Sequence, residues 1–147
     1  MVRVLGIMFA LFIASNVYAE ERQVHVLVFG GDSCTFCTRF ADQVINKQEF
    51  KDFIKDSDIV LWPKKGDVGY LNISRNPDYK VLFDKYRKGF GLGTMIPQTI
   101  IVEIFKDGGK TKARKLGNIV GSKSLGETKR IISTAINGLE INTQENK

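Results

Sequence analysis

Two kinds of hydrophobic pattern alternate along this chain. Continuous apolar runs rich in β-branched residues predict buried strands, and apolar residues repeated every three or four positions predict amphipathic helices. The strand-like runs cover residues 24–29, 59–62, 99–105 and 112–116, with residues 70–73 as a short strand or docked turn. The helix-like repeats begin at Thr35, at Asn76–Pro77 and at Ser122 or Ser124. The predicted order is therefore strand, helix, strand, helix, strand, strand and helix.

This order places the chain in the α/β class. Strands that are joined through helices favour a parallel pair, and the glycine-containing turn at residues 106–110 adds an antiparallel hairpin. No repeat or low-complexity segment interrupts residues 20–141, which predict one domain with a core of its own. Residues 142–147 are polar and predict a flexible tail.

The first nineteen residues have the pattern of a secretory signal peptide. Arg3 provides a positive charge, an apolar run follows from Val4 to Ala14, and Ala19 has the small side chain that a cleavage site needs. The run is shorter than the roughly 20 residues that span a bilayer, although an uncleaved anchor stays open as an alternative. We therefore expect residues 1–19 to be cleaved and the mature chain to be exported, to a periplasmic or other extracytoplasmic space.

Composition limits the partners. The chain has 22 Lys and Arg against 16 Asp and Glu, a net charge of +6, and its basic residues are spread along the sequence. A nucleic-acid partner is not expected, because such proteins gather their basic residues into patches. A solvated basic surface, with a mild preference for acidic partners or a membrane face, is the simpler interpretation.

Cys34 and Cys37 are the only cysteines, and they lie between the first predicted strand and the first predicted helix. The thiolate is the reactive form of cysteine, and the free N–H groups of a helix N-terminus stabilise it. A zinc site usually needs four Cys or His ligands, and the chain has two cysteines and one distant histidine, His25. A structural disulfide would close a very small loop. Thiol–disulfide exchange is the predicted chemistry, with a Cu(I) site or an inert pair as alternatives.

The combination of this Cys-x-x-Cys, the element order and the Ile96–Pro97 pair before the third strand resembles the thioredoxin superfamily. The resemblance covers nearly all of residues 23–139. It implies a thioredoxin-like domain over residues 20–141, with a central mixed sheet of four to five strands flanked by helices. It further implies that Pro97 is cis and lies against the dithiol, and that the backbone of Ile96 pairs with a bound substrate chain.

The sequence departs from thioredoxin itself in three places. Ser33 replaces the tryptophan before the first cysteine, and Thr35–Phe36 replaces Gly-Pro between the cysteines. Val28 lies where thioredoxin has its buried acid. The subfamily is therefore open between thioredoxins, glutaredoxin-like proteins and disulfide-isomerase-like proteins.

The expected function is that of an extracytoplasmic thiol–disulfide oxidoreductase. Cys34 is the expected attacking sulfur and Cys37 the resolving sulfur, with Thr35, Phe36, Ile96 and Pro97 in contact with the substrate. The expected partners are cysteine-containing proteins and an unidentified redox partner, for which a membrane protein is one candidate. We expect a monomer without cofactor or metal. A reductase is favoured because isomerases of this kind usually dimerise through an extra domain.

Two other functions stay open for the same residues. The pair would serve a secreted Cu(I) or soft-metal carrier, or the chain would be a redox-inactive peptide-binding adaptor that uses the surface around Pro97. Two nearby residues receive structural roles instead. We expect Asp32 to order the loop rather than to act as a base, and His25 to be an ordinary strand residue.

Overall fold

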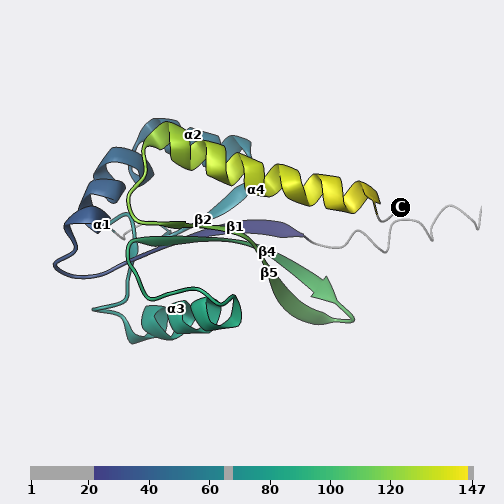
Figure 1. Ribbon diagram of the computed structural model, residues 1–147, viewed down its shortest axis with the longest axis horizontal. Coiled ribbons are helices and arrows are strands. Elements are labelled where there is room, and N and C mark those ends of the chain that lie inside the picture. Colours follow the sequence, from purple (N-terminus) through teal and green to yellow (C-terminus); the bar gives the residue numbers. More distant parts are fainter. Residues whose placement is uncertain (1–21, 65–67, 146–147) are drawn as a thin grey trace, which may run out of the picture.

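The computed structural model describes residues 22–64 and 68–145, with side chains described as far as residue 138, so the expected signal peptide lies outside it. Figure 1 shows helices on both faces of one sheet. The elements in chain order are β1 (Gln23–Gly30), α1 (Thr35–Phe40), the π-helix η1 (Ala41–Ile45), α2 (Gln48–Asp56), β2 (Ile59–Trp62), β3 (Leu71–Asn72), α3 (Pro77–Gly89), β4 (Gln98–Asp107), β5 (Lys110–Val120) and α4 (Leu125–Glu145).

The sheet is mixed, with the strand order β2-β1-β4-β5 and β3 as a fifth strand on β1. β2 and β3 both run parallel to β1 along the same edge: β2 pairs with the first half of β1, whereas β3 pairs with Phe29 and Gly30 at its end. β4 runs antiparallel to β1 and to β5. A mixed sheet in the α/β class, with the cysteine pair at the start of the first helix, confirms the predicted fold class.

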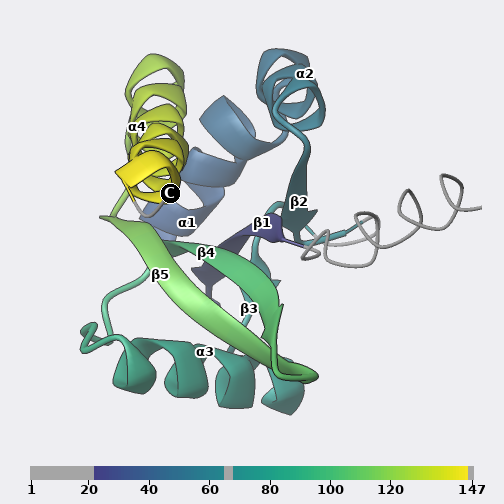
Figure 2. The ribbon, with the colours of Figure 1, turned by 90° about the vertical axis from the view of Figure 1, so that its right-hand side faces the viewer.

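Alternate residues of β1 belong to two separate cores, because successive side chains of a strand point to opposite faces. Val26 and Val28 belong to the core under α1, η1, α2 and α4, together with Phe40, Phe50 and Ile132. Leu27 and Phe29 belong to the core on the other face, which only α3 covers among the described elements (Figure 2). Phe83 of α3 packs on Phe29 there, with ring centroids 5.0 Å apart. The dithiol end of β1 is therefore packed from both sides.

Helix α2 was not predicted. Its apolar repeat is short, since only Phe50 and Ile54 are buried among nine residues. The helix that begins at Thr35 also changes character after Phe40: the amide of Asn46 donates to the carbonyl of Ala41 at 2.8 Å, which is an i to i+5 bond of a π-helical turn. This turn redirects the chain into α2, which covers the sheet beside α4 (Figure 1).

The predicted end of the return strand is wrong. The strand was expected to end at Leu116, but β5 continues to Val120. A β-bulge explains the difference: Ile101 pairs with Gly117 and Val102 pairs with Lys115, so Leu116 is the extra residue. A Cβ at Gly117 would lie 3.5 Å from that of Ala135, which is an ordinary contact distance, so α4 packs against β5 at this point.

Both predicted helix caps that can be checked are confirmed. The Asn76 side chain accepts from the amide of Asp78 with Pro77 in the first turn, and Ser124 Oγ accepts from the amide of Glu127 at 3.2 Å. Helix α4 continues to Glu145, beyond the expected domain end at residue 141. Within residues 22–64 and 68–145, no helix has the length and apolar character that a bilayer span requires.

Candidate active site

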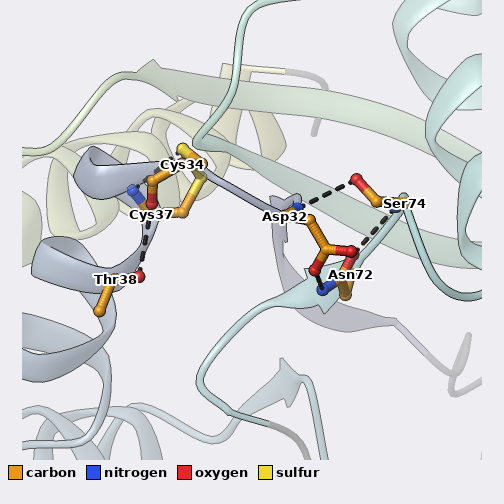
Figure 3. The surroundings of a disulfide bond; sticks show 6 residues. All are labelled: Asp32, Cys34, Cys37, Thr38, Asn72 and Ser74. Carbon is orange, nitrogen blue, oxygen red and sulfur yellow. Dashed lines mark hydrogen bonds between the residues drawn. A yellow bond between two sulfur atoms is a disulfide. The ribbon is translucent and has the colours of Figure 1, made fainter.

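The cysteine pair lies where β1 passes into α1. Three residues after the end of β1 form a loop, Cys34 is the N-cap of α1, and the two sulfurs are joined in a disulfide (Figure 3). Cys34 is half-buried, whereas Cys37, one turn into the helix, is only 1% exposed. Of the two cysteines, Cys34 is therefore the one with surface that solvent can reach.

Cys34 receives the hydrogen bond that a helix N-cap normally receives. The amide of Cys37 donates to Cys34 Sγ at 3.2 Å, and the amide of Thr38 donates to the Cys34 carbonyl at 3.2 Å. The first amides of a helix have no partner within the helix, and they stabilise a negative charge that lies close to the helix N-terminus. In the reduced protein this arrangement would favour the thiolate of Cys34.

The loop before Cys34 is tied to the segment that follows β3. The amide of Asp32 donates to Ser74 Oγ at 3.0 Å, and Asn72 Nδ2 donates to Asp32 Oδ1 at 3.0 Å (Figure 3). Arg75 Nε also donates to Asp32 Oδ1, at 2.9 Å. These hydrogen bonds, that of Asn72 first and that of Arg75 second, lower the pKa of the Asp32 carboxyl below its ordinary value. Asp32 therefore orders the loop, as expected, and is a poor proton acceptor.

Two residues show the unusual backbone and the close packing of this loop. Ser33 has φ of +56°, a left-handed conformation that is unusual for a residue with a side chain. A Cβ at Gly31 would lie 2.8 Å from Ser74 Oγ and 3.0 Å from Ile96 Cδ1. Gly31 is thus the point where the loop before Cys34, the segment after β3 and the segment before β4 meet.

The Ile96–Pro97 peptide bond is cis, as the resemblance implied. The carbonyl of Pro97 accepts from the amide of Gly121 at 2.8 Å, so the segment before β4 is attached to the end of β5. Pro97 is buried and Ile96 is half-buried beside Gly31. The fold therefore brings Ile96 to the loop that presents Cys34. The Trp62–Pro63 bond is also cis, which was not predicted from the sequence.

Exposed apolar side chains surround this end of the sheet. Phe36 is 58% exposed between the cysteines, Met95 is 64% exposed just before Ile96, and Val120 is 41% exposed at the end of β5. Arg39 lies over the Phe36 ring at 5.4 Å from its centroid. Met95 and Val120 were not among the predicted site residues, although the position of Met95 directly before Ile96–Pro97 was a usable signal.

A cavity of about 390 Å³ opens beside the loop, between the helical segment of α1 and η1 and the segment around β3. Its lining presents polar and apolar surface in similar amounts and comprises Asp32, Thr38, Ala41, Asp42, Asn46, Val68, Tyr70, Asn72 and Arg75. The cavity is open to solvent, and so water reaches the Asp32–Arg75 pair.

Two other residues that were considered from the sequence lie away from the disulfide. His25 accepts a hydrogen bond from Trp62 Nε1 at 3.1 Å between β1 and β2, which agrees with its expected place in a strand. Val28 is 1% exposed and fills its position with an apolar side chain. Among the described residues, no three His, Cys, Asp or Glu side chains are grouped so that they could hold a metal ion.

Comparison with known protein families finds no matching family model, and comparison with curated proteins finds no matching relative. Among solved structures, the chain is similar to a thioredoxin from Thermus thermophilus, with a TM-score of 0.51 and 15% sequence identity. The match covers 79% of this chain and 76% of the thioredoxin. Together with the disulfide at the start of α1, this similarity shows that the chain has a thioredoxin-like fold.

Proposed function

We propose that this chain, whose fold is thioredoxin-like, is an exported thiol–disulfide oxidoreductase that reduces disulfides in protein substrates. The main supporting observation is the difference between its two cysteines. Cys34 is accessible and its sulfur accepts the amide of Cys37, whereas Cys37 is buried one turn into the helix. An inert disulfide requires no such difference, but a pair with one attacking and one resolving sulfur does.

The reaction follows from these positions. In the reduced protein, the Cys34 thiolate attacks one sulfur of a substrate disulfide, and the other substrate sulfur leaves as a thiolate and takes up a proton. The Cys37 thiol then loses its proton and attacks Cys34 Sγ. The Cys34–Cys37 disulfide forms, and the first substrate sulfur leaves and is protonated. Two electrons and two protons pass to the substrate, and a partner dithiol returns them to the pair.

The surroundings of Cys34 support a protein substrate rather than a small thiol. Phe36, Met95 and Val120 expose apolar surface, and the backbone of Ile96 lies at the segment before β4. A disulfide-containing chain would pack its apolar side chains on these residues while its backbone pairs with Ile96. Thr35 and Pro97 complete the proposed substrate contact.

Export rests on the sequence, and the direction of the reaction rests on the resemblance to the thioredoxin superfamily. Residues 1–19 have the pattern of a signal peptide. In an oxidising compartment, a reductase needs a redox partner that supplies electrons continually, and a membrane protein would be suited to that role. Expression of the full chain with a C-terminal tag, followed by mass spectrometry of its N-terminus, would test cleavage after Ala19.

A redox titration tests the function itself. The purified chain without residues 1–19 is equilibrated in glutathione buffers, and the state of Cys34 and Cys37 is read by thiol alkylation. A potential near about −270 mV would support the reductase, and one near about −120 mV would indicate a disulfide donor instead. A pair that never cycles would contradict an oxidoreductase of either kind.

Trapping of the mixed disulfide is the second test. The Cys37→Ser variant should accumulate disulfide-linked complexes with substrate proteins, because the resolving sulfur is absent. The Cys34→Ser variant should accumulate none, since the buried Cys37 is out of reach. Equal trapping by both variants would contradict the proposed roles.

A further inference from the structure

Asp32 is held from outside its own loop by three residues that follow one another closely in the chain. Asn72 and Arg75 both donate to Asp32 Oδ1, and Ser74 Oγ accepts from the Asp32 amide. These partners are 40 to 43 residues away in sequence. The side chains are partly exposed, at 44% for Asp32 and 76% for Arg75. They therefore add little to the stability of the fold, because an exposed ion pair contributes little.

Asp32 and Arg75 introduce two opposite charges at the loop that presents Cys34. Asp32 is two residues before Cys34, which places their Cα atoms within about 7 Å of each other. A carboxylate in the loop that presents Cys34 disfavours the Cys34 thiolate, in opposition to the effect of the helix N-terminus. The guanidinium of Arg75, bound to that carboxylate at 2.9 Å, has the opposite effect on the thiolate.

We propose that Asp32 and Arg75 are positioning residues that set the reactivity of Cys34 by opposing electrostatic effects, with Asn72 and Ser74 holding the loop in place. This proposal rests on the proposed function of Cys34 as the attacking thiol. The carboxylate restrains the thiol, and Arg75 offsets that restraint. The β3–α3 segment thus acts on the dithiol from outside its loop and its helix.

The effects of other charged groups in this region must be distinguished from those of Asp32 and Arg75. On α1, Arg39 lies over the Phe36 ring, and on η1, Asp42 lines the same cavity as Asp32. The segment 95–97 before β4 has no titratable side chain. Lys123 is the titratable residue of the loop after β5, and none of these groups is hydrogen-bonded to Asp32 in the described structure.

The test is the pH dependence of alkylation in the Cys37→Ser background, where Cys34 is the only thiol. Asp32→Asn keeps the acceptor oxygen but removes the negative charge, and should lower the midpoint of the rate profile. Arg75→Gln should raise it. For charges about 8 Å apart at an effective dielectric constant of about 40 to 80, each shift is about 0.4 to 0.8 pH unit. The double variant should lie between the two single variants.

Two controls separate charge from loop structure. Arg75→Lys keeps the positive charge and should leave the midpoint close to that of the parent. Asp84→Asn, on α3, removes a carboxylate that likewise accepts from an arginine Nε at 2.9 Å, that of Arg87, and should not move the midpoint. In about 1 M salt, where the Debye length is about 3 Å, the shifts of the Asp32 and Arg75 variants should shrink.

Shifts in the same direction for Asp32→Asn and Arg75→Gln, or no shift in either, would overturn the proposal. That failure is distinguishable from failure of the proposed function, because alkylation requires no redox cycle. If the Cys34–Cys37 pair cycles in the redox titration while the midpoints of the alkylation profiles stay fixed, the proposed oxidoreductase is supported and the proposed role of Asp32 and Arg75 is wrong.

Discussion

The backbone amide of Cys37 donates a hydrogen bond to Cys34 Sγ at 3.2 Å, so the two residues of the disulfide are also the N-cap and the third residue of α1. A side-chain oxygen of serine, threonine or aspartate usually has this role at a helix start. Here the acceptor is the sulfur that must become a thiolate when the disulfide opens. The donor is in place before the charge appears, and this relationship underlies the first prediction.

In the reduced protein, iodoacetamide should modify Cys34 at least about tenfold faster than Cys37. The reason is twofold: the helix N-terminus favours the Cys34 thiolate, and Cys37 is 1% exposed. Peptide mass spectrometry after short reaction times measures both rates. Unfolding in urea is the control, since the difference should then disappear. Faster modification of Cys37 in the folded protein would reverse the proposed roles of the two sulfurs.

The exposed apolar side chains around the disulfide should affect the rate at which protein substrates are reduced, but not the rate for small disulfides. Phe36→Ser and Met95→Ser should each lower the rate of reduction of a disulfide-containing protein by about three- to tenfold, because each removes apolar contact area. Reduction of a small aromatic disulfide should change less than twofold. Val81→Ser is the matched control, since Val81 is 67% exposed on α3. An equal loss in all three variants would show that this surface does not bind the substrate.

The single histidine should make stability depend on pH. Burial, and secondarily the charge of Lys64, lower the pKa of His25 from 6.5, so the unfolded chain binds the proton more readily than the folded chain. Stability is therefore fully present above about pH 6.5 and is lost as the pH falls towards the lower pKa of the folded state. His25→Asn keeps an acceptor for Trp62 and should remove this dependence.

Urea unfolding at about pH 7.5, 6.5 and 5 measures the effect. Trp62 is the only tryptophan, and its indole N–H donates to His25 Nδ1, so its fluorescence reports protonation directly. A fluorescence midpoint above 6.5, or the same pH dependence in His25→Asn, would contradict the prediction.

Because Glu103 on β4 is buried, loss of its arginine partner should destabilise the protein more than loss of Glu103 itself. Glu103 is 0% exposed, and Arg114 donates to its Oε2 from Nε at 3.1 Å and also from Nη2. Arg114→Gln leaves a buried carboxylate with the more distant Arg22 at 3.8 Å, and should cost about 3 kcal/mol. Glu103→Gln leaves arginines that water can reach, and should cost about 1 kcal/mol.

Urea unfolding of the two variants gives both free energies. Lys112→Gln provides a comparison, because its ion pair with Asp107 is exposed and should contribute little to stability. A larger loss in Glu103→Gln than in Arg114→Gln would mean that the desolvation of Glu103 is not the dominant cost.

The elements that could be predicted from sequence are those whose signals are local. The strand at 24–29, the caps Asn76 and Ser124 and the cysteines at the start of a helix each depend on residues within a few positions of one another. The elements that were missed depend on packing. Helix α2 has only two buried side chains to mark it, and β5 continues through Gly117 and Asn118 because β4 pairs with them. Tertiary pairing there overrides local turn preference.

The sequence by itself determined the α/β class, the dithiol at a helix N-terminus and the proline before β4, because periodicity, capping and cysteine spacing are short-range properties. Only the tertiary structure decided what surrounds Cys34. Parallel pairing of β3 with the end of β1 brings Asn72, Ser74 and Arg75 to Asp32, and the close packing at Gly31 brings Ile96 to the same loop. These contacts join residues far apart in the chain, and no local pattern encodes them.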